Sequence, residues 1–168
     1  MARLIILTGA PNAGKTTVAV LLKAQCERLA VIEVDDLRDC IAWMPLAEAV
    51  PLNLINACDI SNNFLAHGLD VLFVYPLSDA DYAFIRPRFA PEQDIVSVAL
   101  WCAPDVNAEF RGSRVLSDWE RERIRWMHAE GMARPHFAQV VDTTHISAQT
   151  TADEVKRICG LDSRVRLS

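Results

Sequence analysis

The sequence lacks the features of membrane and exported proteins. No apolar run is long enough to span a bilayer, and the chain does not start with the basic and then apolar stretch of a signal peptide. Repeats, low-complexity tracts and linkers are also missing. With 168 residues, 51% of them hydrophobic, the chain has the length of one domain that buries its own core. We therefore expect a single cytoplasmic domain over residues 1–168, with no membrane partner.

The cysteines lack the spacing of a metal or redox site. There are five of them, widely separated, with no CxxC pair and no accompanying pair of histidines. We expect them to be reduced and mostly buried, so that neither disulfides nor structural metals hold the fold. The net charge of -5 argues against a protein that coats nucleic acid, because that task needs a positive field. Nucleic acid is thus a possible partner that the composition does not favour.

Lysine is scarce, with 3 residues against 14 arginines. Five arginines fall within one short stretch: Arg111, Arg114, Arg121, Arg123 and Arg125. The planar guanidinium fork matches phosphate oxygens, so this cluster is a candidate phosphate clamp. A solvated helix face, with Glu120 and Glu122 between the arginines, is the alternative interpretation.

Apolar runs of strand length alternate with longer segments of helical period. The expected strands cover residues 3–8, 30–34, 70–75, 94–102 and 137–141. The expected helices cover residues 15–28, 37–44, 51–67, a short segment capped by Ser78, residues 104–111, a segment from Ser117 to Gly131 and one from Thr151 to Cys159. The alternation predicts the α/β class, with a five-stranded parallel sheet between two helix layers. Trp119 and Trp126, seven residues apart, are expected to form a core stripe.

A phosphate-binding motif lies between the first expected strand and helix. The stretch from Gly9 to Thr17 fits the P-loop motif G-x-x-x-x-G-K-[ST] without a mismatch, and it is called the P-loop from here on. Its backbone N–H groups and the helix N-terminus would face the phosphates of a nucleotide. Lys15 would reach the β- and γ-phosphates, and the hydroxyl of Thr16 would hold magnesium. The predicted nucleotide-binding residues are Gly9, Ala10, Pro11, Asn12, Ala13, Gly14, Lys15, Thr16 and Thr17, with ATP and Mg²⁺ as cofactors.

Two further patterns narrow the class of P-loop protein. The Asn-Lys-x-Asp motif with which GTPases read guanine is missing from the sequence. The third expected strand ends without the acidic residue that larger ATPases place near magnesium. Asp35 and Asp36 follow the second expected strand, which we expect to lie next to the P-loop strand, so they are the candidates for this carboxylate. Capping of the next helix is the alternative role for them.

The segment Glu33-Val34-Asp35-Asp36-Leu37-Arg38, together with the P-loop, resembles the shikimate kinase-like and chloramphenicol phosphotransferase-like group of small P-loop kinases. Asp35-Asp36-x-Arg38 is also similar to phage-type polynucleotide 5′-kinases. The resemblance implies that Asp35 is the general base that accepts the hydroxyl proton. It also implies that Asp36 lies at magnesium and at the substrate, and that Arg38 clamps the substrate.

The resemblance extends to the second half of the chain. Residues 109–128 look like a lid segment, with the lid itself at about 111–117, and Arg111 and Arg114 would swing onto the triphosphate. Arg121 and Arg125 would support them, whereas Arg123 is expected to be solvated. The turn at residues 142–144 falls where such kinases place the loop beside adenine, although a plain turn explains it as well.

The sequence identifies the pocket of the phosphoryl acceptor less well than the nucleotide site. Residues 36–67 and the loop after Tyr75 are expected to form its pocket, with possible linings from Trp43, Met44, Asn53, Asn56 and Asn63. The glycine run of shikimate kinases and the long lid of adenylate-type kinases are both missing. We therefore expect an ATP-dependent kinase for a hydroxyl of a small metabolite or antibiotic. A nucleotide or polynucleotide 5′-kinase and a non-catalytic ATP-binding regulator stay open, as do the identity of the acceptor and the oligomeric state.

Overall fold

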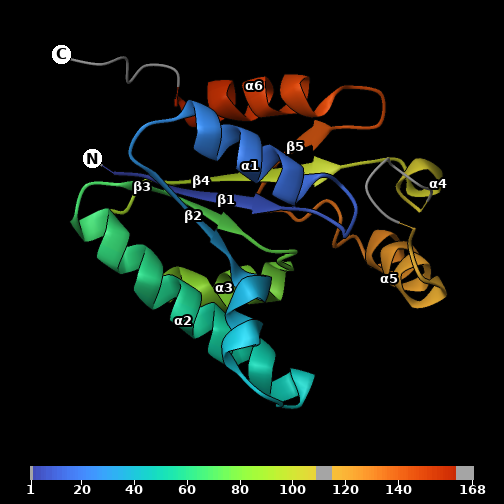
Figure 1. The fold of residues 1–168 in the computed structure, drawn as a ribbon, viewed down its shortest axis with the longest axis horizontal. Helices are drawn as coiled ribbons and strands as arrows, with labels where there is room; N and C mark the ends of the chain where they lie inside the picture. Colours follow the sequence, from blue (N-terminus) through green and yellow to red (C-terminus); the bar gives the residue numbers. More distant parts are fainter. Residues whose placement is uncertain (1, 109–114, 162–168) are drawn as a thin grey trace.

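A computed structural model describes residues 2–108 and 115–161. Its centre is a five-stranded parallel sheet, in agreement with the prediction (Figure 1). The strand order is β2-β3-β1-β4-β5, so β1, which carries the P-loop, lies in the middle. The strands are β1 Leu4–Thr8, β2 Leu29–Glu33, β3 Asp70–Val74, β4 Ile95–Trp101 and β5 Gln139–Asp142.

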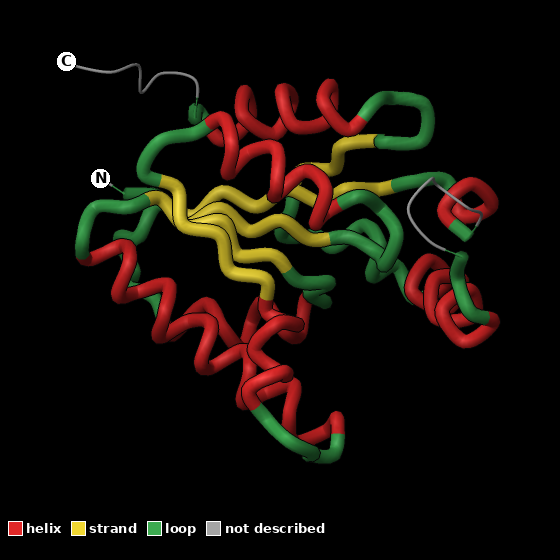
Figure 2. The backbone as a smooth tube through the Cα atoms, in the orientation of Figure 1, coloured by secondary structure: helices red, strands yellow, loops and turns green. Residues whose placement is uncertain are grey.

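Helices cover both faces of the sheet, which gives the three-layer α/β/α architecture (Figure 2). On one face lie α1 (Lys15–Gln25) and α6 (Ala148–Cys159), and on the other α2 (Leu46–Ala66) and α3 (Asp79–Ile85). Side chains of β1 alternate between these layers, because successive residues of a strand point to opposite faces. Ile5 and Leu7 join the core beneath α1 and α6, whereas Leu4 and Ile6 join the core beneath α2.

Three of the remaining elements lie near the carboxyl ends of the strands. The short helices α4 (Pro104–Asn107) and η1 (Val34–Cys40, a 3₁₀ helix) follow β4 and β2, and α5 (Asp118–Ala129) lies beyond α4 (Figure 1). A second 3₁₀ turn, η2 (Arg86–Arg88), follows α3. This end of the sheet is therefore surrounded by segments that can contribute to a ligand site. Within the described residues, no helix combines the length and the apolar character needed to cross a membrane.

Two helix predictions on the acceptor side need correction. The segment after β2 is the 3₁₀ helix η1, which ends at Cys40, and not an α-helix over residues 37–44. The following helix begins at Leu46 and contains Pro51, although we expected it to begin at that proline. Pro51 is the sixth residue of α2, so it removes one i→i−4 hydrogen bond and its ring crowds the preceding turn, yet the helix begins five residues before it.

The helix caps were predicted with mixed success. Ser117 and Glu120 form the expected capping box of α5. The cap of α6 is Ser147 and not Thr151, and its hydroxyl accepts a hydrogen bond from the N–H of Thr150 at 3.0 Å. Serine is as good a cap as threonine, and the added first turn, residues 148–150, is exposed.

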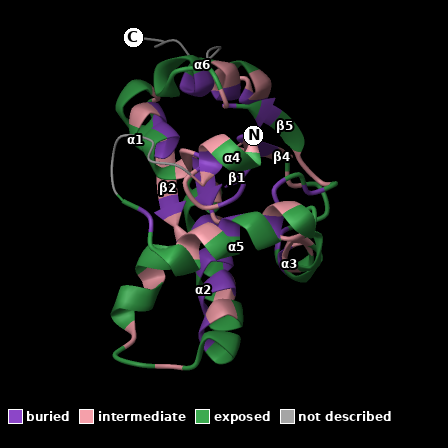
Figure 3. Ribbon diagram, turned by 90° about the vertical axis from the view of Figure 1, so that its right-hand side faces the viewer, coloured by how far each residue is buried: buried purple, intermediate pink, exposed green. Residues whose placement is uncertain are grey.

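The expected core stripe on α5 is wrong. Trp119 is 67% exposed and Trp126 is 46% exposed, whereas the buried residues of this helix are Ile124 and Met127. The exposed surface of α5 is visible in Figure 3. The helix packs through its short buried face against the neighbourhood of α4, and this leaves both tryptophans at the surface.

Candidate nucleotide and acceptor site

The P-loop lies between β1 and α1, as the motif requires. Gly9 has a φ of 131°, and a Cβ added there would lie 2.2 Å from the carbonyl oxygen of Leu100 in β4. No side chain fits in this space, so the first glycine is needed for contact with the neighbouring strand. Gly14 has a φ of 98°, a left-handed conformation that turns the chain into α1. The backbone N–H groups at the start of α1 are thereby presented to a bound anion.

Lys15 is the centre of charge in this loop. Its Nζ donates hydrogen bonds to the carbonyl oxygens of Gly9 and Ala10, both at 2.9 Å. Burial lowers the pKa of Lys15 to about 8, and the negative charges of Asp35 and Glu33 partly oppose this shift. The structure therefore brings the P-loop lysine together with two acidic residues that follow or end β2.

Glu33, the last residue of β2, was not among the predicted site residues. Its Oε1 is buried without a hydrogen-bond partner among the described residues. Burial raises the pKa of this carboxyl, and the Thr16 hydroxyl and Lys15 oppose the increase. An acidic residue at a strand end was the available signal in the sequence. The acidic roles of the site were assigned instead to Asp35 and Asp36, which follow Glu33 within three residues.

The expected neighbour of the P-loop strand is wrong. β2 is not next to the P-loop strand, because β3 lies between β2 and β1. Contact comes instead from α1, which crosses over to pack on β2 as well as on β3. The N-terminus of α1 thus carries Lys15 and Thr16 to the carboxyl end of β2, where Glu33 lies.

The oxygen atoms near Thr16 suit a magnesium ion. Magnesium prefers oxygen ligands, and in nucleotide sites it is usually held by one or two protein groups with phosphates and water. The hydroxyl of Thr16 and the orphaned oxygen of Glu33 are such groups. Asp36 lies close enough to raise the pKa of Glu33. No three or more His, Cys, Asp or Glu side chains gather as a metal site in the described part of the chain.

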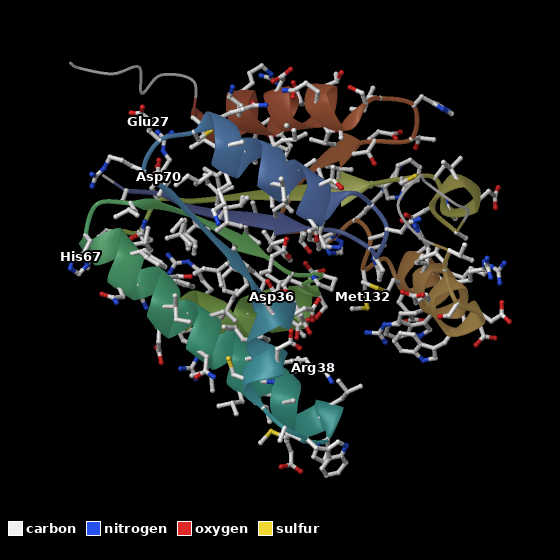
Figure 4. All side chains as sticks on the ribbon, in the orientation of Figure 1. Glu27, Asp36, Arg38, His67, Asp70 and Met132 are labelled. Atoms are coloured by element: carbon white, nitrogen blue, oxygen red, sulfur yellow. The ribbon has the colours of Figure 1, made fainter. Side chains whose placement is uncertain are left out.

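Asp35 and Arg38 lie on η1, beside this acidic group. Burial raises the pKa of Asp35; Lys15 and Arg38 lower it, and Asp36 raises it further. The Asp35 carboxylate thus lies between the P-loop lysine and an arginine. Figure 4 shows Asp36 and Arg38 on η1, with Arg38 nearer the tip where η1 leads into α2. A carboxylate in this position can accept a proton from a hydroxyl group held close to the γ-phosphate.

Tyr75 also belongs to this region, and sequence reasoning did not assign it a role. It directly follows β3, and burial together with Asp35 and Asp81 raises the pKa of Tyr75 to about 12. Arg123 of α5 and Arg38 oppose this shift. Arg123 is exposed, in agreement with the expectation that it is solvated. Its guanidinium also lies 4.7 Å from the ring centre of Trp126.

The other arginines of the cluster have different surroundings. Arg111 and Arg114, with most of the expected lid at 111–117, lie outside the described residues, so their placement over the triphosphate stays a prediction. Arg121 donates to Asp118 at 3.0 Å within α5. Arg125 is exposed.

A cavity of about 340 Å³ lies beside the P-loop. Its walls come from residues 12–18 and from the segment between β5 and α6, including Thr143 and Ile146. Thr143 is 3% exposed, and its hydroxyl lies within hydrogen-bond reach of the Ala13 carbonyl at 3.4 Å. The turn at 142–144 thus does lie beside the P-loop, where a nucleotide base would fit. The side chains of Asp142 and Thr144 bond to each other in that turn.

A buried amide connects the P-loop to α5. The side chain of Asn12 donates to the backbone carbonyl of Asn107 in α4 at 2.8 Å. The Asn107 side chain is fully buried, and in its hydrogen-bonded orientation its nitrogen donates to the carbonyls of Asn12 at 3.1 Å and Pro11 at 3.2 Å. Its oxygen then accepts from Nε2 of His128 at 3.3 Å. The sequence carried no signal for this residue.

No protein-family model matches the sequence, and no curated protein matches it either. Solved structures do share its fold. A gluconokinase from Sinorhizobium meliloti is 17% identical with a TM-score of 0.67, and the alignment covers 95% of this chain and 91% of that one. The tunicamycin resistance protein of Deinococcus radiodurans is 16% identical with a TM-score of 0.63, covering 96% and 97%. An APS kinase from Mycobacterium tuberculosis, in complex with AMPPNP and APS, is 19% identical with a TM-score of 0.57, covering 95% and 98%. The chain therefore has the fold of small P-loop kinases.

Proposed function

We propose that this protein is an ATP-dependent phosphotransferase that moves the γ-phosphoryl group to a hydroxyl of a small molecule. The observation that carries the proposal is the convergence of Lys15, Glu33 and Asp35 at the end of β2. Together these residues would supply a phosphate-binding cation and a proton acceptor in one site. The names of the structural neighbours, a gluconokinase and an antibiotic resistance protein, support a small-molecule acceptor.

The nucleotide would lie along the P-loop. The N–H groups at the start of α1 would hold the phosphates, and Lys15 would leave the carbonyls of Gly9 and Ala10 to bind the β- and γ-phosphates. The base would enter the cavity lined by Thr143 and Ile146. The APS kinase with bound AMPPNP and the absence of a guanine-reading motif both favour ATP.

Thr16 and Glu33 would hold magnesium, with Asp36 nearby. The proposal rests on the orphaned buried oxygen of Glu33 next to the Thr16 hydroxyl. Magnesium bound there would neutralise charge on the β- and γ-phosphates. Thr16 supplies a neutral oxygen and Glu33 a negative one, which together suit a hard cation.

In the proposed step, Asp35 accepts the proton of the acceptor hydroxyl as its oxygen forms a bond to the γ-phosphorus. The bond between that phosphorus and the β,γ-bridging oxygen breaks, and ADP leaves with the electron pair. Arg38 would hold the acceptor next to Asp35. Arg111 and Arg114 would stabilise the transferred charge from the lid, which their sequence position suggests.

The test is ADP release in a coupled assay at saturating Mg²⁺-ATP, with pooled acceptors. The pools are phenicols and aminoglycosides, sugar acids, shikimate, nucleosides, and 5′-hydroxyl oligonucleotides. ADP release that depends on a small-molecule pool supports the proposal. Release that depends on oligonucleotides and falls steeply with salt would point to a polynucleotide 5′-kinase. ATP binding without stimulation by any pool would favour a non-catalytic ATP-binding regulator.

A further inference from the structure

A second cavity, of about 320 Å³, lies at the tip where η1 leads into α2. Arg38 lines it together with seven residues between Ile41 and Ala49, all of which have apolar side chains. The guanidinium of Arg38 is thus the one charged side-chain group on the cavity wall, and the indole N–H of Trp43 is a further hydrogen-bond donor there. A volume of this size suits a ring system of a small ligand.

The cavity adjoins the position of the reacting hydroxyl. Asp35 and Arg38 are three residues apart on a 3₁₀ helix, and side chains with this spacing lie on the same face of such a helix. Arg38 is also close enough to lower the pKa of Asp35. In Figure 4, Arg38 lies between Asp36 and the tip of the η1–α2 loop. A molecule whose hydroxyl is held at Asp35 can therefore extend past Arg38 into the cavity.

The surroundings of the cavity are apolar as well. Trp43 is 82% exposed and Leu46 is 54% exposed, and both line the cavity. Exposed apolar side chains that line one cavity together, and are not scattered singly over the surface, are typical of a ligand site.

We infer that the acceptor is an alcohol that carries an apolar ring and a carboxylate or similar hydrogen-bond acceptor, and that it is not a polyol. The inference rests on the proposed function. The ring would occupy the cavity between Trp43 and Ala49, and the carboxylate or similar hydrogen-bonding group would bind Arg38. A sugar in the same place would bury hydroxyl groups against apolar walls, and each unpaired hydroxyl costs free energy.

The experiment compares two acceptors that both have a primary hydroxyl and a carboxylate: 3-hydroxy-2-phenylpropanoate, whose hydroxymethyl group, carboxylate and apolar ring branch from one carbon, and gluconate, which has a polyol chain. We expect the ring compound to show a KM for ADP release at least about tenfold lower, as burial of a ring provides. Saturation-transfer NMR of the ring protons, with AMPPNP present, measures binding independently of turnover.

The variant Ala42→Trp fills the cavity from an exposed position and should raise the KM of the ring compound by about tenfold or more, with the KM of ATP unchanged. Ala66→Trp is the matched control, because Ala66 is exposed at the other end of α2, about 30 Å from Leu46 along the helix axis. The control should behave like the unmodified protein.

The outcomes separate the two proposals. Equal or better use of gluconate, preference for a 5′-hydroxyl oligonucleotide, or an unchanged KM in Ala42→Trp would overturn the inference. Ring binding that Ala42→Trp abolishes, without ADP release from any acceptor, would support the ligand class and refute the phosphotransferase. ADP release with gluconate but no NMR signal from the ring compound would support the phosphotransferase and refute the ligand class.

Discussion

The side chain of Asn107 in α4 lies 3.3 Å from Nε2 of His128 in α5, and it bonds on its other side to the P-loop. Asn12, one of the two P-loop residues it contacts, has a left-handed φ of 61°. Such a conformation is unfavourable for a non-glycine residue unless neighbouring bonds hold it. One buried amide therefore both supports the loop conformation and ties the loop to the helix that follows the expected lid.

Replacement of this amide should weaken the nucleotide site. In Asn107→Ala, the carbonyls of Pro11 and Asn12 lose a buried donor, which we expect to lower the free energy of unfolding by about 1–3 kcal/mol. Affinity for AMPPNP should fall as well, because the loop is less well ordered. Urea denaturation and calorimetric titration measure the two effects.

Asn63→Ala is the matched control for this variant, since Asn63 is an exposed residue of α2. It should change neither stability nor AMPPNP affinity measurably. If Asn107→Ala lost stability but bound AMPPNP normally, the amide would have a structural role only.

Asp35→Asn should remove turnover and spare nucleotide binding. The amide cannot accept the hydroxyl proton, so we expect kcat to fall by about 10²–10⁴, with the Kd of AMPPNP nearly unchanged. Asp39→Asn serves as the control, because Asp39 is an exposed acid of the same 3₁₀ helix. Turnover by Asp35→Asn at the level of Asp39→Asn would show that another group accepts the proton.

The pKa of the Asp35 carboxylate should also determine where activity falls at acid pH. Burial raises the pKa of Asp35, and the base must be ionised, so activity should fall at a higher pH than for an ordinary aspartate. Arg38 lowers this pKa. Arg38→Gln should therefore shift the acid limb of kcat to still higher pH at saturating acceptor. A shift to lower pH, or none, would show that the limb reports another group.

Glu33→Gln should weaken magnesium use while the ligand-free protein gains stability. Loss of the charged oxygen is expected to raise the Mg²⁺ concentration for half-maximal activity about 10- to 100-fold. Because the pKa of Glu33 is raised in the folded state, its ionisation disfavours folding. The folded state favours the protonated carboxyl of Glu33. This contribution to stability is lost as the pH rises from the ordinary pKa of a glutamate through the raised pKa of Glu33 in the folded protein.

At pH 7 the glutamine variant no longer carries this penalty, so its free energy of unfolding without ligand should equal or exceed that of the unmodified protein. Thermal unfolding with and without Mg²⁺-ADP measures both parts. Glu92→Gln, at an exposed position, is the control. Lower stability of Glu33→Gln without ligand would contradict the assignment.

Lys15 predicts proton uptake on nucleotide binding. With a pKa of about 8 in the free protein, part of the Lys15 population is neutral at pH 8.5, and bound phosphates favour its charged form. Calorimetry of AMPPNP binding at pH 8.5, in buffers of different ionisation enthalpy, should show net proton uptake. The affinity should decrease as the pH rises above 8. In Lys15→Met both the strong binding and this proton uptake should disappear, whereas uptake that persisted there would come from another group.

Local sequence patterns predicted the framework well. The five strands appear as apolar runs, and the P-loop is a contiguous motif that can be recognised from its own residue types. The capping box of Ser117 and Glu120 is similarly local. Such features are readable because the interacting groups are close in the chain.

The errors concern contacts that join distant segments. The spacing of Trp119 and Trp126 suggested a buried stripe, but which face of α5 is buried depends on what packs against it. The contact of Glu33 with Thr16 depends on α1, which brings Thr16 to the end of β2. Asn107 lies in a four-residue helix, and no pattern in the sequence marks a polar residue as fully buried.

The sequence by itself determined the parallel α/β sheet, the phosphate-binding loop and the acidic segment after β2, because periodicity and contiguous motifs act over a few residues. The tertiary structure alone decided that β3 separates β2 from β1, that Leu100 leaves room only for glycine at position 9, and that the side chain of Asn107 bonds to the P-loop. These relationships depend on which elements pack together, and packing is set by the shape and burial of the whole core.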